Sequence, residues 1–238
     1  MSDKVAVYAG TQNIYPRMYT ALKSLLLNNN MDRVYLLIET DEFPYPVPEN
    51  VIVVNVSDQP WFPANGANTK SRYTYMALLK CVLGEMFQEE KKILWLDCDT
   101  IVDDDITDIF EINLNSYYYA GVMEPGKSKD VFRYINVGVL LCNLDQLRRM
   151  GKEPELVAFL NNLQMNLPDQ EVINLLCQGR IRIIDSIYNA NPYVTPCVRP
   201  KVYHYAAMDN YTEQWLWKKY EDMSLFAEEE DDDDTEQE

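Results

Sequence analysis

The feature that most constrains the fold is a series of short apolar runs that are rich in β-branched residues. They cover residues 5–9, 34–38, 51–56 and 93–96. Runs of this length without polar alternation are typical of strands that are covered on both faces. Helix-like stretches separate several of the runs, and this alternation predicts an α/β domain with a parallel-type sheet and right-handed crossovers. Because such sheets bind ligands at the carboxyl ends of their strands, polar residues at those ends are the first candidates for function.

Further helices, strands and loops are expected along the chain. Pro16 has a fixed φ that suits a first helical turn, so the first helix is expected to begin near it and to end at the three asparagines that finish at Asn30. Two more helices are expected over about residues 71–87 and 169–177. The remaining expected elements are strands over residues 137–142 and 181–184 and loops over residues 43–48 and 58–68.

Size and charge limit the domain organisation and the partners. The 238 residues are 47% hydrophobic, which is enough to bury one substantial core. The formal net charge is −17, and the segment 228–238 contributes nine acids and no base, which leaves −8 for the remainder. We therefore expect one domain over residues 1–227 and a disordered acidic tail over residues 228–238. Nucleic acid is disfavoured as a partner, because binding to its phosphates requires clustered Lys and Arg.

Cysteine usage and hydropathy favour a cytoplasmic protein. The five cysteines are scattered and form no Cys-x-x-Cys pair, as expected of free thiols in a reducing compartment. No stretch approaches the roughly 18 apolar residues of a membrane helix, and no secretory signal is recognisable at the start of the sequence. A cytoplasmic location without a transmembrane segment is therefore expected.

Two carboxylates end the most informative of the apolar runs. Asp97 and Asp99 are two residues apart, so in extended geometry they project from the same side of the chain. Two oxygen ligands in this arrangement suit a hard divalent cation, Mg²⁺ or Mn²⁺, that also holds substrate phosphates. The alternative is that an Asp-x-Asp after a strand only begins a turn.

Four segments give the acidic pair a wider context. They are residues 92–102 (KILWLDCDTIV), 136–144 (NVGVLLCNL), 168–174 (PDQEVIN) and 202–205 (VYHY). In this order they resemble glycosyltransferase family 8, which contains glycogenin and bacterial lipopolysaccharide galactosyltransferases, and the resemblance extends over about residues 4–217. It implies a GT-A-type nucleotide-diphospho-sugar transferase fold, a single Rossmann-like domain with a mixed, mainly parallel sheet.

The resemblance implies a metal site. Asp97, Asp99 and His204 would be the ligands, and Mn²⁺ would suit this set better than Mg²⁺ because the set includes an imidazole. The alternative for His204, the only histidine in the sequence, is a packing role between two tyrosines.

The resemblance also implies a sugar pocket. Asn136 would contact the donor sugar, Asp169 and Gln170 would line the pocket next to the reacting carbon, and Lys80 would contact the donor. Each has a structural alternative when taken alone: Asn136 satisfies a turn, Asp169 caps a helix, and Lys80 is a solvated lysine on a helix. The order of the segments along the chain favours the functional interpretation.

The first strand and the loop after it resemble the uridine-binding segment of the family. The implied nucleotide contacts are Ala9, Thr11, Asn13 and Tyr15, together with Cys98 between the two aspartates. Thr11 stands where the family usually has an acidic residue, and Tyr15 could stack on uracil only with a one-residue shift.

The chain departs from the family pattern after His204, where the family has a Gly three residues on and a Lys six residues on that clamps the diphosphate. Ala207 and Asn210 stand at these positions. Loss of that cation removes a charge-assisted contact to the leaving group, so either turnover is slow or another base replaces it. The candidates are Lys201, Lys218 and Lys219.

These inferences predict a retaining, Mn²⁺-dependent glycosyltransferase that moves glucose or galactose from a UDP-sugar to a saccharide, protein or lipid-linked acceptor. The sequence does not separate the two sugars or identify the acceptor. One alternative is a nucleotide-sugar hydrolase or nucleotidyltransferase, which would use the same paired aspartates. The other is a non-catalytic sugar-nucleotide-binding protein, in keeping with the residues at positions 207 and 210.

Overall fold

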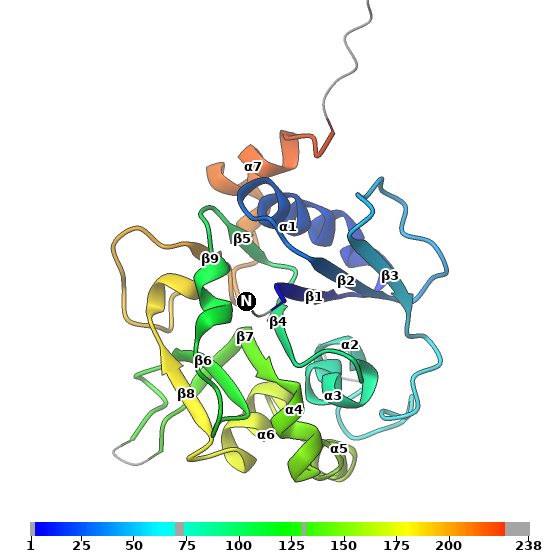
Figure 1. The fold of residues 1–238 in the computed structure, drawn as a ribbon, viewed down its shortest axis with the longest axis vertical. Coiled ribbons are helices and arrows are strands. Elements are labelled where there is room, and N and C mark those ends of the chain that lie inside the picture. The colour runs from blue at the N-terminus through cyan, green and yellow to red at the C-terminus, as the bar shows by residue number, and fades with distance from the viewer. Residues whose placement is uncertain (1–2, 70–73, 130–131, 227–238) are drawn as a thin grey trace, which may run out of the picture.

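The computed structural model describes residues 3–69, 74–129 and 132–226. Within these ranges, seven strands form a central sheet with the order β3-β2-β1-β4-β7-β6-β8 (Figure 1). The strands are β1 (Val5–Ala9), β2 (Arg33–Ile38), β3 (Val51–Asn55), β4 (Lys92–Leu96), β6 (Tyr119–Met123), β7 (Ile135–Asn143) and β8 (Ile181–Ile184).

Most neighbouring strands of this sheet are parallel. β1 pairs in parallel with β2 and with β4, β2 with β3, and β6 with β8. β7 is the exception, because it is antiparallel to both of its neighbours, β4 and β6. The sheet is therefore mixed and mainly parallel, which confirms the expected fold class. The reversal of β7 also brings its first residues to the edge of the sheet at which β4 and β6 end.

Helices cover both faces of the sheet. On one face lies α1 (Tyr15–Asn28), and α7 (Trp215–Asp222) packs against α1 on the side away from the sheet (Figure 1). On the other face lie α2 (Tyr75–Leu78), α3 (Leu83–Met86), α4 (Leu144–Met150), α5 (Glu153–Asn162) and α6 (Pro168–Leu176). Because successive side chains of a strand alternate in direction, β1 contributes Val5 and Val7 to the core with α2–α6 and Ala6 and Tyr8 to the core with α1.

A second, two-stranded sheet connects distant parts of the chain. β5 (Thr100–Val102) pairs antiparallel with β9 (Val202–His204), and Thr100 is opposite His204. β5 follows directly on the acidic pair, so this pairing brings the late part of the chain back to Asp97 and Asp99.

Most of the elements expected from the sequence are present, but the helix expected over residues 71–87 is wrong. The described part of that segment forms α2, the 3-10 turn Leu79–Cys81 and α3, and Ser71–Tyr73 lie outside the described residues. Val82 breaks the helix at φ −132° and ψ 16°, and the N–H of Gly84 in the next helix donates to the buried Glu153 carboxylate. The Gly84 N–H thus bonds to a side chain from another helix in place of the backbone carbonyl that a continuous helix would offer.

Two other expectations concern the acidic segment at the C-terminal end and the absence of a transmembrane segment. The acidic segment 228–238 lies outside the described residues. Among the helices that are described, none is long and apolar enough to cross a membrane.

Candidate active site

The polar residues of the site gather where several strands meet the same edge of the sheet. Asp97 follows the last residue of β4, Glu124 follows the last residue of β6, and Asn136 is the second residue of β7. The backbone N–H of Asp97 donates to Gly138 O of β7 at 2.8 Å, which fixes the acidic pair beside the reversed strand. The direction of β7 thus explains why an amide near a strand start joins carboxylates at strand ends.

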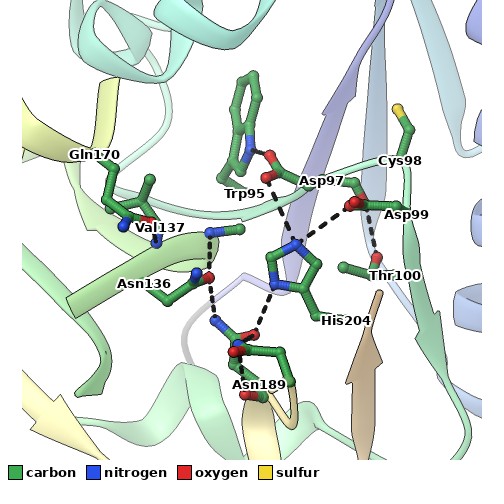
Figure 2. Close-up of polar contacts among 12 residues, drawn as sticks. Trp95, Asp97, Cys98, Asp99, Thr100, Asn136, Val137, Gln170, Asn189 and His204 are labelled. Carbon is green, nitrogen blue, oxygen red and sulfur yellow. Dashed lines mark hydrogen bonds and ion pairs between the residues drawn. The ribbon is translucent and has the colours of Figure 1, made fainter. Parts of the chain in front are cut away.

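Asp97, Asp99 and His204 form a cluster at this edge (Figure 2). One ligand atom from each of the three lies within 4.8 Å of the others. His204 Nε2 is 3.3 Å from Asp99 Oδ1 and 4.0 Å from Asp97 Oδ2. Two carboxylates and an imidazole at such distances could hold a divalent metal ion.

Two contacts hold the imidazole in place. His204 Nδ1 lies 2.9 Å from Asn189 Oδ1, and Asn189 Nδ2 donates to Asn136 Oδ1 at 2.9 Å. Because an amide oxygen can only accept, Nδ1 donates in this contact, and Nε2 is the ring nitrogen that faces the carboxylates of Asp99 and Asp97. The ring also packs on Gly138, where any Cβ would overlap its atoms, so only glycine fits at this position.

The three side chains influence one another electrostatically. Burial alone would lower the pKa of His204, but the carboxylates of Asp99 and Asp97 raise it above its ordinary value. Burial would raise the pKa of Asp99, but the neighbouring His204 holds it below its usual range. The cluster without a metal therefore attracts positive charge.

Lys80 was expected to contact the donor or, as the alternative, to be a solvated lysine, but it lies buried beneath the cluster. Its side chain is 1% exposed, and its Nζ is 2.6 Å from Asp169 Oδ2 and 3.2 Å from Asp97 Oδ1. Burial works against the charged form, but Asp169 and Asp97 raise the pKa of Lys80 above its ordinary value. Lys80 does not line either of the cavities described below. It therefore orients the two carboxylates.

A pocket of about 290 Å³ begins at the cluster, and we call it the β7 pocket. Its lining includes Asp97, Asp99, Glu124, Lys127, Asn136, Asp169, Gln170, Tyr193, His204 and Ala207. Asn136 Nδ2 donates to Glu124 Oε1 at 2.9 Å, and Gln170 accepts from Val137 N–H at 3.2 Å. The structure thus brings Asn136, Asp169 and Gln170 together with the metal-ligand candidates.

Glu124 is a member of this pocket that the sequence reasoning missed. Its side chain is 3% exposed, and Oε2 lies 3.0 Å from Lys127 Nζ. Gln170 Nε2 lies 3.3 Å from Glu124 Oε1. A single acid after a strand that was itself not expected, β6, offers no motif. Only its position directly after the apolar segment 119–123 could have indicated it.

A second cavity, the β1 cleft, has a volume of about 520 Å³ and shares Asp97, Asp99 and Ala207 with the β7 pocket. Its lining includes Ala9, Thr11, Asn13, Ile14, Arg17, Met76, Cys98, Met208, Asp209 and Tyr211. Four of the expected nucleotide contacts, Ala9, Thr11, Asn13 and Cys98, therefore line one cleft.

Tyr15 does not line the β1 cleft, so its expected stacking on a base is wrong. The residue is 2% exposed, its ring packs against Phe43 with centroids 5.4 Å apart, and its hydroxyl accepts from Glu39 N–H at 3.0 Å. Tyr15 begins α1 and points into the core, whereas its neighbour Ile14 lines the cleft.

The structure shows how the chain differs from the family pattern after His204. Ala207 has a φ of +58°, a left-handed conformation in which glycine is favoured. The three lysines considered as substitutes for the missing cation are engaged elsewhere. Lys201 pairs with Asp108, Lys218 with Glu221 and Lys219 with Asp103. None of the three lines either cavity.

A mixed sheet of this order, with carboxylates and an imidazole where its strands end, defines a GT-A-type glycosyltransferase fold. The chain belongs to glycosyl transferase family 8, because the sequence model of that family matches residues 6–215. The match covers all the site residues described above.

Relatives in this family share part of their length with the chain. The probable glycosyl transferase Gly of Streptococcus gordonii is 28% identical over 165 residues, which are 65% of this chain and 23% of that protein. Glycosyltransferase GlyE of Streptococcus pneumoniae serotype 4 is 24% identical over 198 residues, which are 79% of this chain and 48% of GlyE. The chain thus spans less than half the length of these two relatives.

Solved structures share the fold. The crystal structure of GlyE aligns with a TM-score of 0.72 and 20% identity, over 94% of this chain and 61% of that one. The galactosyltransferase LgtC, solved in complex with donor and acceptor sugar analogs, aligns with a TM-score of 0.68 and 20% identity, over 95% of this chain and 98% of LgtC.

Proposed function

We propose that the chain is a retaining hexosyltransferase that moves glucose or galactose from a UDP-sugar to a hydroxyl group of a saccharide, protein or lipid-linked acceptor. The observation that carries this proposal is that the β7 pocket and the β1 cleft both contain Asp97 and Asp99. A donor with its sugar in the pocket and its nucleotide in the cleft would have its diphosphate at the shared aspartates. The complex of LgtC with donor and acceptor sugar analogs supports a two-substrate site on this fold.

Asp97, Asp99 and His204 would hold a divalent cation, with Mn²⁺ preferred over Mg²⁺ because imidazole is one of the ligands. When bound, such an ion neutralises the charge that develops on the leaving diphosphate. The contact between His204 Nδ1 and Asn189 keeps Nε2 free for this purpose. Lys80 holds Asp97 in a fixed orientation from below.

The residues of the β7 pocket would orient the sugar. Lys80 holds one oxygen of Asp169, so the carboxylate keeps its direction when a sugar hydroxyl donates to it. Asn136 would contact the sugar from β7, and Gln170 would border its anomeric carbon. Glu124 accepts from the amides of both Asn136 and Gln170, and this shared acceptor fixes their relative positions.

Retention would follow from attack on the face that the diphosphate leaves. The bond between the anomeric carbon and the phosphate oxygen breaks with its electron pair going to that oxygen, and the acceptor oxygen forms the new bond. The acceptor proton passes to the same phosphate oxygen, so no separate base is needed. Gln170 would border the opposite face of the oxocarbenium-like state.

The test is incubation of the protein and Mn²⁺ with UDP-glucose and UDP-galactose and a panel of sugar acceptors. We expect release of UDP together with a glycosylated product that keeps the anomeric configuration of the donor, as read by NMR. UDP or sugar phosphate released without a glycosylated acceptor would favour the hydrolase or nucleotidyltransferase alternative. Donor binding without release would favour a non-catalytic binding protein. The cytoplasmic location stays a prediction, which fractionation of the producing cells would test.

A further inference from the structure

The β1 cleft has an unbalanced set of charges. Three carboxylates line it, those of Asp97, Asp99 and Asp209. Of the residues that line it within the described ranges, Arg17 is the one Lys or Arg. Among the charged side chains that the structure describes in this cleft, a diphosphate would therefore meet three carboxylates and one guanidinium, besides whatever cation the shared aspartates hold.

Arg17 is not committed to a carboxylate. It is an exposed residue in the first turn of α1, and its guanidinium carbon lies 5.2 Å from the centroid of the Tyr211 ring. Among the described residues no carboxylate lies within ion-pair distance of it. Lys201, Lys218 and Lys219, in contrast, each have a carboxylate within 3.0 Å. Arg17 hydrogen-bonds to the Tyr211 side chain, but among the described residues its charge is not neutralised by a carboxylate, as the charges of those lysines are.

The aromatic ring beneath Arg17 is itself fixed. Tyr211 is 6% exposed, its ring stacks on Tyr205 at a centroid distance of 5.5 Å, and it contacts the edge of Trp217 at 4.7 Å. A guanidinium that lies over such a ring keeps its N–H groups in its own plane, where they can reach two oxygens of a phosphate. The start of α1 adds the positive end of a helix dipole to the same part of the cleft.

We propose that Arg17 is the phosphate-binding cation of this cleft, donating charge-assisted hydrogen bonds to the diphosphate of the donor from its place on Tyr211. The inference rests on the proposed function, because it takes a nucleoside diphosphate as the occupant of the β1 cleft. Arg17 would stabilise the diphosphate before transfer and the additional negative charge on it after the sugar has left.

The experiment compares UDP, UMP and uridine as probes in the presence of Mn²⁺. The variants are Arg17→Ala and Arg17→Lys, and the control is Lys218→Ala, which removes one positive charge from an exposed residue outside both cavities. Affinity is measured by calorimetry for UDP and UMP and by competition against UDP for uridine. Because Arg17 is exposed, its variants are expected to fold, and the melting temperature of each metal-free protein checks this.

Loss of Arg17 should weaken UDP roughly tenfold, UMP less, and uridine not at all, with Arg17→Lys in between because lysine keeps the charge without the planar fork. Lys218→Ala should bind all three probes as the wild type does. An equal loss for uridine and UDP would overturn the proposal, because Arg17 would then contact the nucleoside. UDP affinity that is unchanged in Arg17→Ala, with normal binding by the wild type, would overturn the Arg17 assignment alone. Failure of the wild type to bind UDP would instead refute the proposed function and the assignment that rests on it.

Discussion

The β7 pocket and the β1 cleft share two aspartates but differ in how their polar side chains are held. In the pocket, Asn136, Asp169 and Gln170 are 5–7% exposed. Each is held by another buried polar residue, either Glu124 or Lys80. A network of buried groups that satisfy one another has its geometry before a ligand arrives.

The β1 cleft, in contrast, has exposed polar side chains at Asn13, Arg17 and Asp209, although Tyr211 is buried. Exposed side chains contribute little to the packing of the fold, so their loss costs ligand affinity and little stability. We therefore expect substitutions in the pocket to change both stability and turnover, and substitutions in the cleft to change donor affinity alone.

The largest effect is expected at a residue that both cavities share. Asp99→Asn should lower kcat by at least about 1000-fold and leave the fold intact, because it removes a metal-oxygen bond on which the leaving group depends. Asp97→Asn should be equally inactive but less stable, because Asp97 also pairs with Lys80 and accepts from Trp95 Nε1 at 2.6 Å.

The measurement is UDP release at saturating Mn²⁺, with melting of the metal-free proteins in parallel. Asp104→Asn is the control, since it removes the same charge from an exposed residue outside both cavities. Near-normal turnover of Asp99→Asn would contradict the assignment of the metal site.

The next largest effect is a difference in the free energy of unfolding between a variant of the β7 pocket region and a variant of the β1 cleft. Lys80→Met should lower the free energy of unfolding by about 3 kcal/mol, because it leaves Asp97 and the buried Asp169 without their cation. Arg17→Ala in the β1 cleft should change it by no more than about 0.5 kcal/mol. Urea denaturation at pH 7 compares the two directly. If Lys80→Met were as stable as the wild type, the pocket would not be the preorganised region.

Features that depend on local sequence patterns were predicted, and features that depend on the tertiary arrangement of strands were not. Most of the strands follow from local patterns, although β6 was not expected. The Asp97–Asp99 pair lies in a turn after β4, which was the alternative to the extended geometry that the spacing suggested. Asn136 and Gln170 were reached only through the order of the segments, and they gather because β7 is reversed. That reversal is a tertiary property that no local pattern in residues 135–143 encodes.

Some residues around both cavities were misplaced or missed, for physical reasons that differ from residue to residue. Tyr15 and Ile14 differ by one position, which on a helix start is a rotation of about 100° and exchanges core for cleft. Glu124 and Asn189 support the site residues through side-chain contacts between distant segments, which spacing alone does not reveal. Arg17 joins the site only through the packing of α1 beside Tyr211.

A smaller effect should appear in the pH dependence of metal binding. The proton and the metal compete for His204 Nε2, so Mn²⁺ affinity should be full above the raised pKa of His204 and fall as the pH drops below it, by up to about tenfold per pH unit. The stability of the metal-free protein should change in the opposite direction. A raised pKa stabilises the protonated fold, so its contribution is present below pH 6.5 and is lost as the pH rises through the folded value.

Calorimetry of Mn²⁺ binding and denaturation without metal, both from pH 5.5 to 8.5 in steps of about half a unit, test these signs. Burial also raises the pKa of Glu153 to about 7, which adds to the stability trend in the same direction. Glu153→Gln is therefore the background in which the His204 contribution to stability is measured. Mn²⁺ affinity that does not change with pH would show that His204 is not a ligand and is a packing residue instead.

The smallest effect is expected at Ala207, which lines both cavities but contributes only a methyl group. Its φ of +58° costs an alanine about 1 kcal/mol relative to glycine, and this explains the Gly of the family pattern at this position. Ala207→Gly relieves that strain but makes the unfolded chain more flexible, so the net gain in the free energy of unfolding should be about 0.5 kcal/mol. Ala206→Gly is the matched control: Ala206 is not left-handed, so the same change there should destabilise the protein by a similar amount. Urea denaturation of the two variants and the wild type resolves the opposite signs. A less stable Ala207→Gly variant would mean that the left-handed turn between the two cavities is not strained, and that the chain has no structural cost from its departure at this position.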